Sequence, residues 1–208
     1  MRFMKSCLGC FAAIGVVTIL AIIALFVGYY FVSLTPPIRE QMTPVTLSAE
    51  AAQSLSRKTE AFQLEIDAAV REGKERQATL VITEEEVNSR LVELLAEDNT
   101  PVKEIMINFR KGALLRYWVF DTPVFKAKIA ARTKLEAAGS KTKMTMEETN
   151  LGKLPLTPWL NQRAGDIMAW TGEVLTGIIT VPGDLPLQIT TINIEDGQIT
   201  VNVLAYKK

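Results

Sequence analysis

Residues Cys7–Leu34 read CLGCFAAIGVVTILAIIALFVGYYFVSL, and the chain carries no charged residue between Lys5 and Arg39. A helix of about 20 apolar residues spans the roughly 30 Å hydrocarbon core of a bilayer, and it satisfies its own backbone hydrogen bonds there. A soluble helix of this length would need a polar outer face, which this segment lacks. The sequence therefore predicts a transmembrane helix.

The residues that flank this segment predict its orientation. Arg2 and Lys5 precede it, whereas Arg39 is followed at once by Glu40. Because lysine and arginine favour the cytoplasmic side, we expect a cytoplasmic N-terminus and an extracytoplasmic C-terminal part, in a single-pass protein of the cell membrane. The alternative is a cleaved signal peptide, whose apolar region is normally about 7–15 residues long. The greater length here, and its end at Tyr-Tyr-Phe, favour an uncleaved signal anchor.

The domain organisation follows from this anchor. Residues 1–34 form a cytoplasmic tip and the transmembrane segment, and residues 35–46 contain several prolines, which is typical of a semi-rigid linker. Residues 47–208 are long enough to form one domain with its own core. Basic and acidic residues number 23 each, so the chain lacks the positive charge that nucleic-acid binding requires. Both cysteines, Cys7 and Cys10, precede this domain, which excludes a disulfide-rich scaffold.

Several classes of chemistry are missing from the sequence. The chain has no histidine, which excludes Ser-His-Asp and Cys-His catalysis and the usual zinc sites. The acidic triplet Glu84–Glu86 follows Thr83, and this order is typical of a helix N-terminus with a capping box, not of a metal site. We predict no catalytic residue, no metal site and no cofactor. An enzyme that uses two carboxylates stays a minor alternative, since any two acids can meet in space.

Helical periodicity appears in three places after the anchor. The first helix is expected from Ser48 to about Glu72, with one apolar stripe that packs on the domain's own sheet. The alternative use of this stripe is a coiled-coil seam for self-association. A short helix begins after Thr83, and a third is expected from Pro158 to about Ile178. The stripe of the first helix contains Leu55, Thr59, Phe62, Ile66 and Ala69.

The remaining segments alternate with a period of two, as strands do. A first strand is expected at 77–82, and the strand at 114–120 is apolar on both faces, so that something must cover each of them. Turns are expected at Lys111–Gly112 and Asp196–Gly197, and a bulge at Thr190–Thr191. The predicted fold class is α+β, with a curved antiparallel sheet of about six to seven strands packed against two long helices and one short one.

Three short motifs carry a family resemblance. They are ITEEEVNSRL at Ile82–Leu91, LGKLPL at Leu151–Leu156 and IEDGQI at Ile194–Ile199, placed after an N-terminal anchor. In this arrangement the chain resembles the YpmS-like single-pass extracytoplasmic membrane proteins, and more distantly the LmeA-like phospholipid-binding proteins. The resemblance implies a curved antiparallel sheet around helices, an apolar groove and lipid binding in the cell envelope. It implies no catalytic residues.

Two sets of residues are candidates for ligand contact. Aromatic, methionine and isoleucine side chains are expected to line a site for an apolar ligand, because they are large and adaptable. Basic residues on one sheet face are expected either to attract anionic headgroups or to form an ordinary solvated face. The apolar set is Trp118, Phe120, Phe125, Ile129, Met144, Met146, Met168 and Trp170, and the basic set is Lys126, Lys128, Arg132, Lys134, Lys141 and Lys143.

These features favour a membrane-anchored envelope protein whose outer domain binds a phospholipid, a glycolipid or another long apolar ligand. The alternative is an interaction or regulatory subunit of an envelope complex, which would bind protein partners or itself. The two hypotheses differ in what the apolar sheet face contacts: a ligand in the first, and the filled core of the domain in the second.

Overall fold

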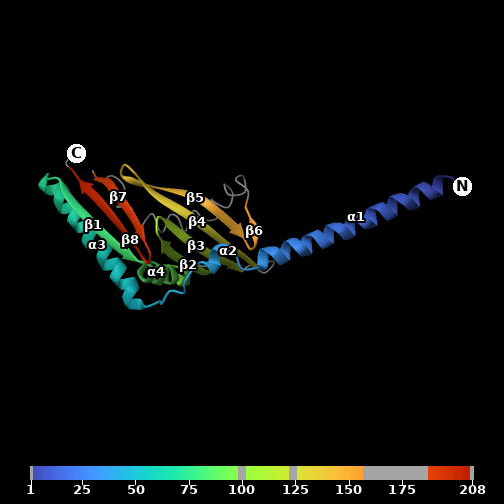
Figure 1. The fold of residues 1–208 in the computed structure, drawn as a ribbon, viewed down its shortest axis with the longest axis horizontal. Helices are drawn as coiled ribbons and strands as arrows, with labels where there is room; N and C mark the ends of the chain where they lie inside the picture. The colour runs from blue at the N-terminus through green and yellow to red at the C-terminus, as the bar shows by residue number, and fades with distance from the viewer. Residues whose placement is uncertain (1, 98–101, 122–125, 157–186, 207–208) are drawn as a thin grey trace.

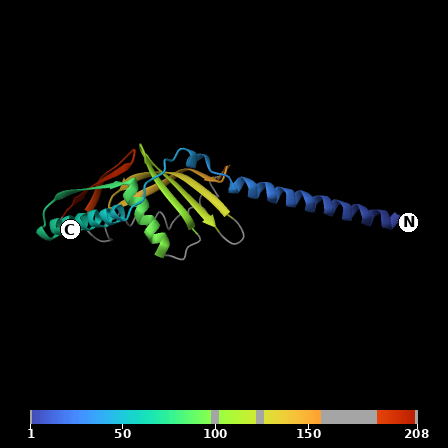
Figure 2. The same ribbon diagram turned by 90° about the horizontal axis from the view of Figure 1, so that it is seen from below.

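The computed structural model describes residues 2–97, 102–121, 126–156 and 187–206 (Figure 1). Helix α1 (Arg2–Ser33) projects from one end of the molecule, and α3 (Ala49–Glu72) lies at the other end (Figures 1 and 2). The large apolar side chains of α1 from Ile14 to Phe31 are exposed, and α1 is long and apolar enough to cross a membrane. The predicted N-terminal apolar helix is thus confirmed.

The strands form two antiparallel sheets. In the smaller sheet β8 (Gln198–Ala205) lies between β1 (Arg76–Thr83) and β7 (Leu187–Glu195). In the larger sheet the strands follow chain order: β2 (Val102–Arg110), β3 (Ala113–Asp121), β4 (Lys126–Ala138), β5 (Lys141–Leu151) and the short β6 (Leu154–Pro155). The α+β class is confirmed. The prediction of one curved sheet with six to seven strands is wrong, because the described residues place eight strands in two sheets.

The two sheets meet through their turns and share one core. The Gly112 N–H donates to Ile194 O at 3.0 Å, and the Ile189 N–H donates to Gly139 O at 2.8 Å. Both predicted turns place a glycine at positive φ, which side chains disfavour, and the register of β7 shifts between Ile189 and Thr191, as the expected bulge requires. Inner-face residues of both sheets therefore pack into a single hydrophobic cluster.

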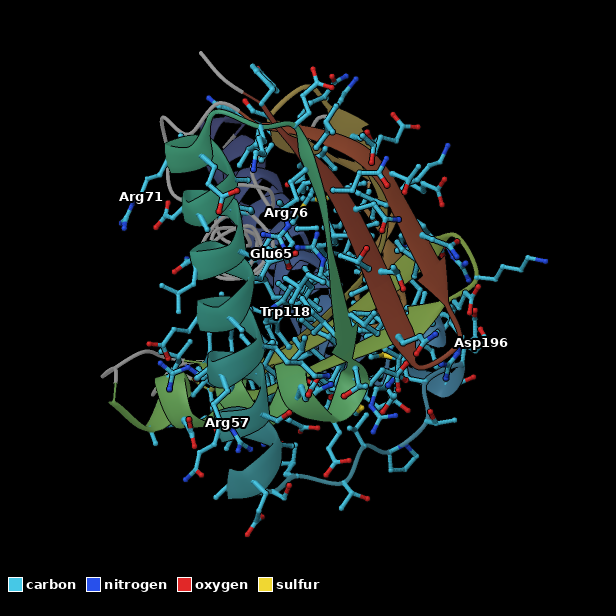
Figure 3. The ribbon with its side chains drawn as sticks, turned by 90° about the vertical axis from the view of Figure 1, so that its left-hand side faces the viewer. Arg57, Glu65, Arg71, Arg76, Trp118 and Asp196 are labelled. Atoms are coloured by element: carbon cyan, nitrogen blue, oxygen red, sulfur yellow. The ribbon has the colours of Figure 1, made fainter. Side chains whose placement is uncertain are left out.

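Helix α3 closes one side of this cluster. Its N-terminus is capped by Ser48, whose hydroxyl accepts from the Ala51 N–H at 3.1 Å, and its C-terminus ends at Gly73 with φ of 66°. Four members of the predicted stripe are buried in the domain's own core: Leu55, Phe62, Ile66 and Ala69. Packing on the sheet is confirmed for these four, so they are not exposed as a coiled-coil seam. An ion pair of 3.4 Å between Glu65 and Arg76 joins α3 to β1, and both residues are labelled in Figure 3.

Helix α4 (Glu84–Glu97) begins with the predicted capping box, since the Thr83 hydroxyl accepts from the Glu86 N–H and the Glu86 carboxylate accepts from the Thr83 N–H. It also covers the edge strand β2. The Asn88 side chain accepts from the Ile107 N–H at 2.8 Å and donates to Ile107 O at 2.7 Å. Asn88 therefore supplies the hydrogen bonds of a missing neighbouring strand.

Strand β3 is covered on both faces, as its sequence predicts. Leu114 and Trp118 face the shared core, whereas Leu115 and Tyr117 face a second cluster on the outer side of the larger sheet. The second cluster contains Ile38 and Met42, which come from the segment expected as a linker. That segment includes the short helix α2 (Pro37–Glu40), and the Arg39 guanidinium stacks on the Tyr117 ring at 5.3 Å. Residues 36–42 are thus packed against the sheet.

Candidate functional site: the inner face of the larger sheet

Five members of the predicted apolar set lie together on the inner face of the larger sheet. Trp118 and Ile129 are directly opposite each other on β3 and β4 and are buried, and Trp118 lies in the interior in Figure 3. Phe120, Met144 and Met146 are half-buried and pack against the shared core. The sheet register sets this grouping, because Met144 and Met146 are opposite Leu135 and Thr133 of β4. The other three, Phe125, Met168 and Trp170, lie outside the described residues.

A charged residue lies within this apolar face. Arg116 of β3 is only 1% exposed, and one of its terminal nitrogens donates to the Thr133 hydroxyl at 2.8 Å. Its guanidinium also stacks on the indole of Trp118, with 5.1 Å between the guanidinium carbon and the ring centroid. Burial lowers the pKa of Arg116 to about 10. The side chain therefore stays protonated at neutral pH, inside a region that is otherwise apolar.

Two N–H groups of this cluster have no hydrogen-bond acceptor among the residues that the structure describes: Nε of Arg116 and Nε1 of Trp118. Within the same part of the chain, Arg116 forms no ion pair with a carboxylate, and burial is the only cause of its lowered pKa. Buried donors are nearly always paired, and a buried charge without a counterion is costly. The arrangement is therefore unusual for a side chain that serves packing alone.

Sequence reasoning did not find Arg116, although the sequence contains a signal for it. In the alternation of β3, residue 116 shares its face with Leu114 and Trp118, so the strand that is apolar on both sides places one cation inside. Because alternate residues of a strand face the same side, the alternation of β3 alone places Arg116 on the inner face.

A separate groove of about 520 Å³ lies between the segment before α3, the helix α4 and the strand β2. Its walls are mainly apolar, and Arg39, Lys103 and Glu104 add charges to its lining. The apolar lining residues are Val45, Leu47, Val92, Leu95, Val102 and Met106. This groove was not predicted from the sequence, because its two sides are far apart in the chain.

The six basic candidates all lie on the outer face of β4 and β5, together with several acidic residues. Lys134 pairs with Glu136 at 2.9 Å and Lys126 with Asp121 at 3.7 Å, while Arg132 and Lys143 are opposite Glu148 and Glu136 in the sheet register. Arg132 also donates to Gln41 Oε1 at 2.9 Å. Lys128 and Lys141 complete the set. The face therefore carries mixed charge, which is typical of a solvated sheet surface.

Among the described residues, no group of three or more acidic, cysteine or histidine side chains could hold a metal ion. Comparison with models of known protein families gives no match, and comparison with the curated proteins gives none either.

Proposed function

We propose that this protein is a single-pass, membrane-anchored protein of the cell envelope, and that its extracytoplasmic domain binds a lipid or another long apolar ligand without catalysis. The supporting observation is the inner face of the larger sheet, where Phe120, Met144, Met146 and Leu151 remain half-buried and pack against the shared core. Large, adaptable side chains in such positions are suited to contact with a flexible apolar chain. The resemblance to YpmS-like and LmeA-like proteins points to the same role.

The position of the anchor supports this proposal. The Lys153 N–H donates to Phe31 O at 3.0 Å, and the Gly152 N–H donates to Lys128 O at 2.7 Å. The C-terminal end of α1 therefore contacts the turn that follows β5, and it also lies against β4. The inner-face residues at this end of the sheet, Phe120 and Leu151, are consequently the ones nearest to the proposed bilayer surface, where a lipid would arrive.

The proposed topology has a direct test in cells. Protease added to the outside of intact spheroplasts should digest the chain after residue 34 and leave a membrane-embedded N-terminal fragment. Digestion from the cytoplasmic side alone should leave the domain intact. The reverse pattern would contradict the extracytoplasmic location.

The alternation of β5 provides a sharp test of lipid contact. Met144 points to the inner face and its neighbour Lys143 to the outer face. A photoreactive side chain introduced at Met144 should crosslink to lipid in native membranes, whereas the same group at Lys143 should crosslink much less. Equal lipid crosslinking at both positions, or none at Met144, would contradict the proposal.

The second candidate is an interaction subunit of an envelope complex, and the groove beside α4 favours it. Val92 of α4 and Leu47 of the segment before α3 are exposed apolar side chains that line this groove. A photoreactive group at Val92 should recover one reproducible protein partner from intact cells if this candidate is correct. Crosslinking to lipid at Met144 with no protein product at Val92 would favour the lipid-binding role.

A further inference from the structure

We infer that Arg116 and Trp118 bind the acidic group of the lipid, a carboxylate or a phosphate, so that the inner face selects anionic lipids over neutral lipids of the same chain length. This inference rests on the proposed function and specifies its ligand. It follows from two buried donors and one buried charge that the described residues leave unsatisfied.

The charge of Arg116 is the first observation that supports binding of an acidic group. Arginine stays protonated in proteins, and a guanidinium removed from water is stabilised mainly by an anion. The Thr133 hydroxyl and the Trp118 ring are neutral, so neither balances the charge. A buried water molecule can accept a hydrogen bond from Nε, but it also leaves the charge uncompensated. A bound acidic group accepts the hydrogen bond from Nε and also balances the charge of Arg116.

The geometry of the N–H donors is the second observation that supports binding of an acidic group. Arg116 and Trp118 are two residues apart on one strand, so their side chains rise from the same face with a spacing of roughly 7 Å between their Cα atoms. The Thr133 hydroxyl holds one arm of the guanidinium, and the Nε–H remains for another acceptor. Carboxylates and phosphates present several acceptor oxygens, which match the N–H donors of a guanidinium.

The direction of β3 is the third observation, and it gives the orientation of the lipid. From Arg116 the strand runs past Trp118 to Phe120, over roughly 13 Å, toward the end of the sheet that contacts α1. An acidic group at Arg116 would therefore lie inside the domain, and its apolar chain would extend along Trp118 and Phe120 toward the membrane. In this orientation the acidic group contacts the guanidinium of Arg116, and the hydrocarbon chain contacts the aromatic rings of Trp118 and Phe120.

The test uses 9,10-dibromostearic acid and its methyl ester, which share a chain and differ in charge. Bromine quenches tryptophan fluorescence, so titration of the full chain in a non-ionic detergent gives a dissociation constant for each probe. We expect the acid to bind the natural chain at least about tenfold more tightly than the ester, the effect of a charge-assisted hydrogen bond. Arg116→Gln should abolish this preference, because the acid should then bind no more tightly than the ester.

Arg132→Gln is the matched control, because Arg132 lies on the neighbouring strand but on the outer face. It should keep the preference of the natural chain. Oleoyl lysophosphatidic acid and monooleoylglycerol, used as competitors of the brominated probes, form a second pair that distinguishes phosphate from carboxylate. Preference for the acidic member in either pair supports the inference and identifies the headgroup.

The outcomes separate the inference from the proposed function. Binding of both members of each pair with equal affinity would overturn the role of Arg116 and leave lipid binding standing. Binding of neither member, in either pair, would contradict the proposed function itself. If Arg116→Gln folds poorly, the comparison of acidic and neutral probes on the natural chain still separates these outcomes. Arg116→Lys keeps the charge and should retain part of the preference for the acidic probe.

Discussion

The backbone N–H of Lys153 donates a hydrogen bond of 3.0 Å to the carbonyl oxygen of Phe31, which joins the turn between β5 and β6 to the last turn of the apolar helix α1. Helices leave their last carbonyl groups without intrahelical partners, and here the folded domain supplies a donor. The packing of Ile38 and Met42 on the outer face of the sheet adds a second attachment. The domain is therefore held against α1 at two places, and in the proposed topology we expect it to keep one orientation to the membrane.

Gly152 makes this attachment possible, and its substitution is the first prediction. Gly152 has φ of 57°, and a Cβ at this position would overlap the carbonyl oxygens of Phe31 and Val32. Gly152→Ala should therefore break the contact, and the Lys153 amide should exchange with deuterium at least about tenfold faster, as amides do when local structure opens. Gly139→Ala is the control, because Gly139 has φ of 67° and open space around it. Faster Lys153 exchange in both variants would contradict the role of the contact.

Asn88→Ala should destabilise the domain strongly. The substitution removes two hydrogen bonds to the Ile107 backbone and leaves buried polar groups on β2 without partners. We expect the free energy of unfolding to fall by about 2–4 kcal/mol in a denaturant titration. Arg90→Ala, on the same helix, removes only the partly exposed pair with Glu93 and should cost about 0.5 kcal/mol or less. Similar losses of unfolding free energy in the two variants would contradict the role of Asn88 in holding β2 through hydrogen bonds.

The carboxyl of Glu86 should make the domain sensitive to acid. Burial alone would raise its pKa, but hydrogen bonds from Lys58, Ser54 and the Thr83 N–H outweigh burial and hold the pKa below its ordinary value of 4.5. A carboxyl with a lowered pKa adds stability above about pH 4.5 that is lost as the pH falls through the folded-state pKa. Glu86→Gln should lower the free energy of unfolding by about 1–3 kcal/mol at pH 7. It should also make the free energy of unfolding fall less steeply as the pH is lowered. An unchanged pH dependence of unfolding in this variant would contradict the assignment.

Arg116→Met should have opposite effects on stability and on ligand preference. Replacing buried ion pairs by apolar side chains of similar volume is often neutral or stabilising by about 1–4 kcal/mol, and a buried charge without a counterion gains even less from staying charged. We therefore expect the lipid-free variant to unfold at the same or a higher denaturant concentration than the natural chain. Trp118→Leu, which removes buried aromatic volume, should lose about 2–4 kcal/mol. A comparable loss for Arg116→Met would indicate that Arg116 serves the fold instead of a ligand.

Local patterns in the sequence predict much of this architecture. Ser48 and Gly73 delimit α3, and Thr83 with Glu86 begins α4, because caps act through neighbouring backbone groups. The two apolar faces of β3 also follow from alternation alone. These features depend on residues that are close in the chain, and a single sequence contains all that determines them.

Contacts between distant segments were not predictable in the same way. The division into two sheets depends on β8 pairing with β1, which precedes it by more than a hundred positions. The packing of Ile38 on the outer sheet face likewise depends on a surface formed later in the chain. In the candidate site, alternation identified Trp118 and Met144, whereas the significance of Arg116 required knowledge of what surrounds it.

The most direct test of lipid binding is the mass of the purified full chain. The protein would be extracted from native membranes in a mild detergent, exchanged extensively into fresh detergent and analysed by native mass spectrometry. A fragment of residues 1–46, which contains α1 and the segment after it, would be treated in parallel as the anchor control, for lipid that adheres to α1. We predict one retained lipid per full chain, absent from the anchor control. A full chain that carries no lipid, or carries the same lipids as the anchor control, would contradict the account.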